Sequence, residues 1–128
     1  THPKIRHMGY VSEEEKSSLI EGAAVVIMPS RYESLSMIVL EAWALGRPVL
    51  ANAACAVLEG QCRRSNGGLY YRDYAEFRLM LRRLMGDPVL QANLGAQGEE
   101  YVTANYSWAR AAAQTDDLLH ELQSRAAK

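Results

Sequence analysis

The sequence predicts an α/β fold: a Rossmann-like parallel sheet of about four strands flanked by helices, with a helical C-terminal tail. Short apolar runs with the length of buried strands recur at residues 23–28, 48–52 and 69–72. Helix-capping residues and glycine or proline stops lie between these runs. Strands and helices that alternate at such short spacing are typical of βαβ units, whose strands pair in parallel.

Residues 4–11 (KIRHMGYV) are β-like at both ends and interrupted by Gly9, which predicts a short strand followed by a loop. Ser12 then precedes three consecutive glutamates. A serine with a glutamate three residues later forms a capping box, and an acidic first turn suits the positive end of the helix dipole. A helix capped by Ser12 is therefore expected to run to about Gly22.

The next run, residues 23–28 (AAVVIM), is continuously apolar and is ended by Pro29. This pattern predicts a strand buried on both faces, as in a parallel sheet. Ser34 is the expected cap of a second helix, which reaches Leu45 and stops at Gly46.

Residues 48–52 (PVLAN) predict the next strand, and residues 69–72 (LYYR) predict the last one, after a glycine turn. Asp73 is the expected cap of a helix that ends near Met85.

The tail from Pro88 onward is expected to be helical, with a break around residues 105–107, and to pack on the faces of the sheet. Trp43 and Trp108 are interpreted as core residues, because large aromatic side chains bury much apolar area.

The composition is that of one globular domain of 128 residues. Lys and Arg number 14 against 15 Asp and Glu, and a net charge of −1 argues against a nucleic-acid partner. The longest apolar stretch, residues 37–45, contains Glu41 and is well short of the roughly 20 residues that a membrane span needs. Cys55 and Cys62 match no zinc pattern, so we expect two reduced thiols and no metal site.

The segment 29–52 (PSRYESLSMIVLEAWALGRPVLAN) carries the chemical information. A strand ends at its first residue, a short loop follows, and the helix is expected to begin near Leu35. Ligands of open α/β sheets bind at the carboxyl ends of the strands. We expect the backbone N–H groups of Ser34, Leu35 and Ser36 to form an anion site at the helix start, with a phosphate or pyrophosphate as its ligand.

Glu41 stands in a helix that is otherwise apolar almost all round, where a carboxylate is costly unless it is hydrogen-bonded. It either lies on a solvent-facing stripe or accepts hydrogen bonds from ligand hydroxyls such as a ribose diol. Glu33 comes eight positions earlier. At about 1.5 Å of rise per residue the two carboxylates are about 10 Å apart, too far to share a proton but suited to an extended ligand.

The segment resembles the E-x7-E signature of retaining GT-B glycosyltransferases of the family-4 type, with Glu33 and Glu41 as the two acids. MGYVSEEEKSSLIEGAAVVIMPSRYE is similar to the family's approach to this motif, and EAWALGRPVLAN is similar to the run that follows it. Later sequence motifs similar to those of the family follow in order. They are Glu59, at the position of the Glu in the family's "PE" motif, the NGGL turn at 66–69, Asp87-Pro88 and Tyr106-Ser107-Trp108. The resemblance covers nearly the whole chain.

The resemblance implies a role for each site residue. Glu33 would be the catalytic-site acid that contacts hydroxyls of the donor sugar, and Glu41 would bind the ribose of the nucleotide. The amides of Ser34, Leu35 and Ser36 would hold the diphosphate, as a metal does in other glycosyltransferases. The implied reaction is transfer of a hexosyl-type sugar from a nucleotide-diphosphate donor to an acceptor hydroxyl with retention, without a metal or other cofactor.

The chain departs from the family pattern beside the expected pocket. Ser34 and Ser36 replace two glycines, Cys55 and Ala56 replace a glycine pair, and Leu58 replaces a proline. Side chains at glycine positions restrict the backbone, and the serine hydroxyls can either donate to a phosphate or crowd it. The departures concern the shape of the donor pocket rather than the fold.

The resemblance also implies that residues 1–128 form a single domain, most of the C-terminal, nucleotide-sugar-binding half of a GT-B enzyme. The chain alone is then expected to be inactive, with the acceptor (a sugar, lipid-linked sugar or other hydroxyl compound) held by an N-terminal domain. The expected setting is carbohydrate biosynthesis in the cytoplasm, including the inner face of the membrane. Arg31, Arg63 and Arg64 are interpreted as solvated surface charges.

Several alternatives stay open. Arg78, Arg82 and Arg83 form either a solvated helix face or a weak dock for anionic lipid at the membrane surface. An exposed sheet edge would favour self-association. The other functions in view are a non-enzymatic α/β nucleotide-binding or interaction module, and a nucleotide-sugar epimerase or phosphorylase on the GT-B fold.

Overall fold

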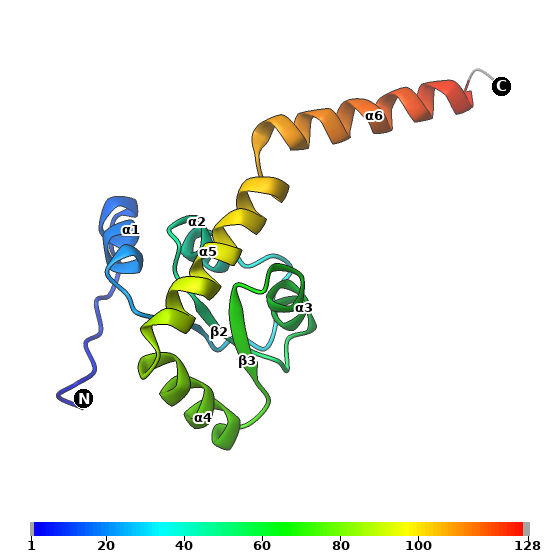
Figure 1. Cartoon of the computed structure of the whole chain (residues 1–128). Coiled ribbons are helices and arrows are strands. Elements are labelled where there is room, and N and C mark those ends of the chain that lie inside the picture. Colours follow the sequence, from blue (N-terminus) through cyan, green and yellow to red (C-terminus); the bar gives the residue numbers. More distant parts are fainter. Residues whose placement is uncertain (1, 127–128) are drawn as a thin grey trace.

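The computed structural model describes residues 2–126, which form a parallel sheet flanked by helices (Figure 1). The sheet has three strands in the order β1-β2-β3, with bounds β1 Val26–Met28, β2 Val49–Asn52 and β3 Gly68–Tyr71. Both pairs are parallel, with Ile27 opposite Leu50 and Leu50 opposite Leu69. The predicted α/β class is confirmed, but the described residues contain three strands rather than four.

The expected first strand is wrong. Residues 4–11 have no regular secondary structure and lie on the surface, where the side chain of Tyr10 is fully exposed and that of Ile5 is 65% exposed. A β-like sequence becomes a strand only where a neighbour completes its hydrogen-bond ladder, and no described strand lies beside this segment.

Two helices begin at the predicted caps. Helix α1 (Glu13–Glu21) has the full capping box: the Glu15 N–H donates to the Ser12 hydroxyl at 3.2 Å, and the Ser12 N–H donates to the Glu15 carboxylate at 2.9 Å. Helix α4 (Tyr74–Met85) is capped by Asp73, as predicted. Helix α5 (Pro88–Asn105) begins at Pro88 as expected, and its cap, Asp87, was not predicted. Local side-chain chemistry alone accounts for these starts.

Helix α2 (Met37–Ala44) begins two residues later than expected, because Ser36 and not Ser34 is its N-cap. Ser34 and Leu35 therefore lie in the preceding loop.

Helix α3 (Ala56–Ser65) was not predicted at all. Its N-cap, Cys55, makes no side-chain hydrogen bond, and it is held by burial of one face against the sheet, at Leu58, Gln61, Cys62 and Ser65.

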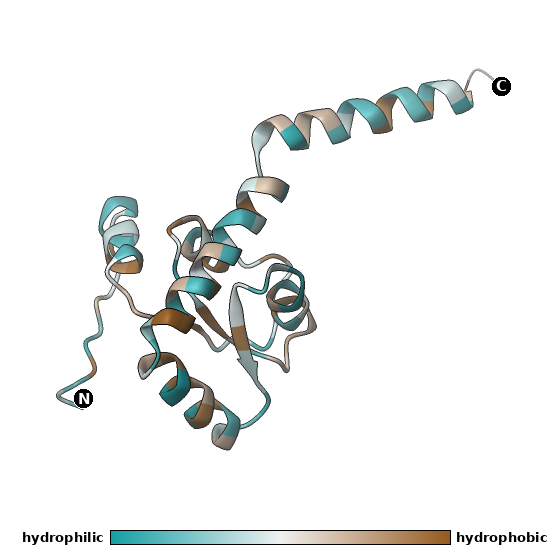
Figure 2. Cartoon of the chain, in the orientation of Figure 1, coloured by the Kyte–Doolittle hydropathy of each residue, from teal (hydrophilic) through white to brown (hydrophobic). Residues whose placement is uncertain are grey.

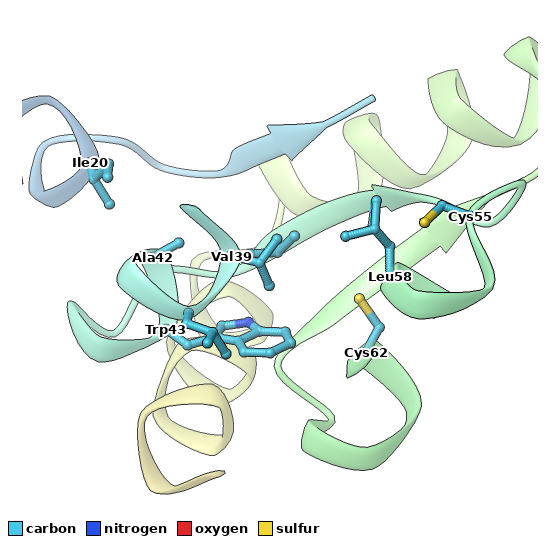
Figure 3. Close-up of a cluster of buried hydrophobic side chains, with 10 residues drawn as sticks. Ile20, Val39, Ala42, Trp43, Cys55, Leu58 and Cys62 are labelled. Carbon is cyan, nitrogen blue, oxygen red and sulfur yellow. The ribbon is translucent and has the colours of Figure 1, made fainter. Parts of the chain in front are cut away.

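The core lies on both faces of β2, because successive strand residues point to opposite sides. Val49 and Ala51 pack with α1, α2 and α3, whereas Leu50 packs with Leu84 of α4 and Leu94 of α5. Figure 3 shows the first cluster, in which Trp43 of α2 lies with side chains of α3. The expected burial of Trp43 is confirmed, with none of the residue exposed.

Helix α6 (Trp108–Ala126) follows the predicted break but has no buried residue and extends away from the body (Figures 1 and 2). The expectation that the whole tail packs on the sheet therefore holds for α5 and fails for α6. Trp108 is 92% exposed, so its assignment to the core is wrong. Its position depends on tertiary contacts that no local pattern encodes.

Candidate functional site

The carboxyl ends of β1 and β2 open into a pocket of about 530 Å³. One wall is the loop between β1 and α2, and the other is the start of α3. Its lining residues are Arg31, Tyr32, Glu33, Ser34, Ala54, Cys55, Ala56 and Val57. The pocket is therefore at the sheet edge where ligands of open α/β folds bind.

Two helices that begin at this sheet edge, α2 and α3, both lack a side-chain cap. Helix α4 also begins at this edge, after β3, but its start is capped by the Asp73 side chain. Helices α1 and α5 begin elsewhere and are capped by Ser12 and Asp87. The first backbone N–H groups of a helix have no partner within the helix and carry its positive dipole end. The edge thus presents uncapped helix starts, an arrangement that favours a bound anion.

Ser36, one of the predicted site residues, is buried at the start of α2, with 2% of its surface exposed. Its hydroxyl has no hydrogen-bond partner among residues 2–126. Because α2 begins at Met37, the helical N–H groups free for an anion belong to the first residues of that helix rather than to Ser34, Leu35 and Ser36. The predicted amides lie immediately before them, in the loop.

Glu33 and Glu41 line different pockets. Glu33 shares the pocket at the strand ends with Ser34, whereas Glu41 and Leu35 line a pocket of about 330 Å³ against the junction of α5 and α6. The same loop contributes Ser34 to the first pocket and Leu35 to the second. The structure therefore groups the five predicted residues around one loop but does not place both acids in one cavity.

Glu41 is neither fully solvated nor isolated. Its Oε1 accepts a hydrogen bond from Nζ of Lys16 on α1 at 3.1 Å, and the two side chains are 32% and 29% exposed. Its Oε2 is buried and has no partner among the described residues. Lys16 is a site residue that the sequence did not reveal, because the pair spans 25 residues and two helices.

Asn52 is a second residue that sequence reasoning missed. Its side-chain amide donates to the carbonyl of Pro29 at 3.0 Å, and its side-chain oxygen accepts from the N–H of Ala54 at 2.9 Å. One side chain thus joins the loops that follow β1 and β2. A polar residue that ends a buried strand was the available signal, since that edge carries ligands.

Arginines surround the site in different roles. Arg31 is exposed and lines the main pocket and also a second cavity of about 380 Å³ at the strand ends, which reaches Arg72 and Tyr74. Arg63 pairs with Glu59 at 2.8 Å, and the Nε of Arg64 donates to the Tyr101 hydroxyl at 3.4 Å. Arg63 and Arg64 are therefore exposed but paired, more ordered than the solvated charges expected.

Residues 2–126 contain no group of three or more His, Cys, Asp or Glu side chains arranged to hold a metal ion. Within the same residues, no helix is both long enough and apolar enough to cross a bilayer.

A parallel sheet flanked by helices, with a ligand-sized pocket at the carboxyl ends of its strands, defines a Rossmann-like domain that matches the GT-B glycosyltransferases. The chain belongs to the family described as "Glycosyl transferases group 1", whose model matches residues 1–87.

Curated relatives include an MMP alpha-(1->4)-mannosyltransferase from Mycolicibacterium hassiacum, 33% identical over 91% of this chain and 29% of that protein. A D-inositol 3-phosphate glycosyltransferase from Streptomyces bingchenggensis is 32% identical over 91% of this chain and 26% of that protein. Among solved structures, sucrose-phosphate synthase from Thermosynechococcus elongatus aligns with a TM-score of 0.77 and 28% identity, over 91% of this chain and 30% of that one. The chain thus spans less than a third of the length of these relatives.

Proposed function

We propose that this chain binds the nucleotide-diphosphate sugar donor of a retaining glycosyltransferase of the family-4, E-x7-E type. The observation that carries the proposal is the pair of uncapped helix starts, at Ser36 and Cys55, on the edge of the sheet where the main pocket opens. Backbone N–H groups that no side chain satisfies suit a diphosphate, which needs several hydrogen-bond donors and positive potential.

In this proposal Glu33 contacts the hydroxyls of the donor sugar, and Glu41 binds the ribose. The loop amides of Ser34, Leu35 and Ser36, together with the first N–H groups of α2, hold the diphosphate between them. An extended ligand that lies across this loop reaches both carboxylates, although they line separate pockets. The arrangement supports recognition of one ligand at two ends.

The proposed chemistry is transfer of a hexosyl-type sugar to an acceptor hydroxyl. Amides and helix dipoles would stabilise the negative charge that develops on the leaving diphosphate, the role that a metal ion has in other glycosyltransferases. The acceptor would be held by a part of the protein outside this chain, so that the chain alone is inactive. The relatives, a mannosyltransferase and a D-inositol 3-phosphate glycosyltransferase among them, support a sugar or sugar-like acceptor. A cytoplasmic location stays part of the proposal.

Calorimetric titration of the full-length protein with UDP, GDP and ADP tests the proposal, using Ser34→Asp and its neutral counterpart Ser34→Asn. Ser34 is exposed and lines the pocket, so either side chain fits at little cost to folding. A carboxylate beside the diphosphate adds like-charge repulsion, and we expect affinity to fall at least about tenfold, or ~1.4 kcal/mol. The asparagine variant should stay within about threefold of wild type.

Equal affinity of the aspartate and asparagine variants would contradict a diphosphate in this pocket. Glu41→Gln should lower the affinity for the same nucleotide, because an amide nitrogen replaces one of the two carboxylate oxygens that accept hydrogen bonds. Turnover that is unchanged by a chelator would support the metal-free mechanism, and turnover that the chelator abolishes would contradict it.

A further inference from the structure

The two oxygens of the Glu41 carboxylate have different surroundings. Oε1 accepts from Nζ of Lys16 at 3.1 Å, whereas Oε2 is enclosed and has no hydrogen-bond partner among the described residues. Buried polar atoms that a folded chain leaves unpaired are uncommon, and they mark places where a group from outside the chain can bind. The Glu41 side chain lines a pocket, so its acceptor capacity is used only in part by the protein.

Lys16 is held in place from its own helix. Its Nζ also contacts the Glu13 carboxylate at 2.6 Å, one turn earlier on α1. The capping box of Ser12 and Glu15 fixes that turn. The carboxylates of Glu13 and Glu41 raise the pKa of Lys16, so the ammonium group stays charged at physiological pH. Lys16 is therefore a fixed cation and not a freely rotating surface lysine.

The rest of α2 gives Glu41 no other support. Its buried residues, Val39, Leu40, Ala42 and Trp43, are apolar. A carboxylate on such a helix without a compensating charge would turn toward water, because desolvation of an unpaired ion is costly. Among the described residues, the ion pair with Lys16 is the contact that keeps the Glu41 side chain oriented toward its pocket.

We infer that Lys16 is a positioning residue, which holds the Glu41 carboxylate in the orientation that accepts the ribose hydroxyls of a nucleoside diphosphate. This inference rests on the proposed function of Glu41. Lys16 uses one acceptor site of Oε1 and leaves the remaining acceptor sites of the carboxylate for the diol. It thereby sets the preference of the site for a ribose over a sugar that lacks the two hydroxyls.

The test compares affinities of the full-length protein for a ribonucleoside diphosphate and for its 2′,3′-dideoxy counterpart, with whichever of UDP, GDP and ADP the wild type binds. We expect the wild type to prefer the ribonucleotide at least about tenfold. Lys16→Met should reduce this preference at least about fivefold. Its affinity for the dideoxy nucleotide should stay within about twofold of the wild-type value. Lys16→Arg should restore most of the preference, because it keeps a cation within reach of Glu41.

Glu14→Gln is the matched control. It removes a carboxylate from the same first turn of α1 that forms no ion pair among the described residues, so the preference should be unchanged. A wild type without any preference would overturn both the ribose role of Glu41 and this inference. A wild-type preference that Lys16→Met retains would overturn the inference alone. Equal loss of both affinities in Lys16→Met, with a lower melting temperature, would show a structural role and would also overturn it.

Discussion

Trp43 donates its indole N–H to the carbonyl oxygen of Gly67 at 2.8 Å, which ties the last turn of α2 to the residue before β3. The ring also packs edge-on against Tyr101 of α5, with centroids 5.9 Å apart and planes at 86°. Because the indole is wholly buried, one side chain links α2, α5 and the far edge of the sheet. The loop that carries the candidate site precedes this anchored helix.

Replacement of Trp43 by Phe should lower the free energy of unfolding by about 1–4 kcal/mol. The lost hydrogen bond accounts for about 1 kcal/mol, and the cavity left by the smaller ring adds the rest. Urea denaturation measures the change. Trp108→Phe is the control, since that side chain is 92% exposed and should shift stability by less than about 0.5 kcal/mol. Equal losses of stability at the two positions would contradict the burial of Trp43 and the exposure of Trp108.

Gly98→Ala tests the close approach of α5 to α2. A Cβ at this glycine would collide with the Trp43 ring, and so would one at Gly67. Alanine in a helix interior normally gains about 1 kcal/mol over glycine, but overpacking costs about 1–3 kcal/mol, so we expect a net loss of stability. Gly22→Ala is the control, because its φ is −79° and its Cβ would meet no atom closer than 3.4 Å. That variant should be neutral or slightly stabilised in the same denaturation assay.

A matched pair of leucines tests the contrast between the core and α6. Leu58 is fully buried, and Leu122 is 51% exposed on α6. Leu58→Ala should cost about 2–5 kcal/mol of unfolding free energy, and Leu122→Ala less than about 0.5 kcal/mol in the isolated chain. A large loss in the Leu122 variant would show that α6 is packed in solution. Thermal unfolding followed by circular dichroism separates these outcomes.

Burial, followed by the nearby Glu59 charge, raises the pKa of the Cys62 thiol from 9.0 to about 12. The native protein should therefore resist alkylation at pH 8, because the thiolate is the reactive form. The folded state binds the thiol proton more tightly than the unfolded state. This contribution to stability is complete below pH 9 and is lost as the pH rises toward about 12.

Stability measured between pH 9 and 11 checks this prediction for Cys62. The wild type should lose stability more steeply with rising pH than Cys62→Ala, although the variant is less stable at pH 7 because of its cavity. Parallel pH profiles for the two proteins would contradict the raised pKa. Rapid alkylation of native protein at pH 8 would contradict it independently, provided that Cys55, which is also buried, is identified separately by mass spectrometry.

Much of the fold was predictable because its signals are local. The capping box at Ser12 and the aspartate cap at Asp73 satisfy helix N–H groups within a few residues, so the sequence alone specifies them. The apolar runs that became β1 and β2 are bounded by prolines. The carboxyl-edge location of Glu33 and Ser34 followed from the general geometry of parallel sheets.

The structural predictions that failed did so for physical reasons. Helix α3 contains Gly60 and no side-chain cap, so its local propensity is poor, and the burial of Leu58 and Cys62 on the sheet stabilises it instead. The start of α2 was predicted two residues too early, because Ser34 is a favourable cap residue by type. The helix instead begins after Ser36, which makes no side-chain cap hydrogen bond and is buried, so no local capping interaction marks this start.

The sequence by itself determined the alternation of strands and helices, the family marks and the loop on which the candidate site is built, since each depends on neighbours within a few positions. Only the tertiary structure decided that Lys16 meets Glu41, that Glu33 and Glu41 line separate pockets, and that Trp108 stands in solvent while Trp43 is buried. These facts depend on contacts between segments distant in the chain, whose energies arise only when the helices dock on the sheet.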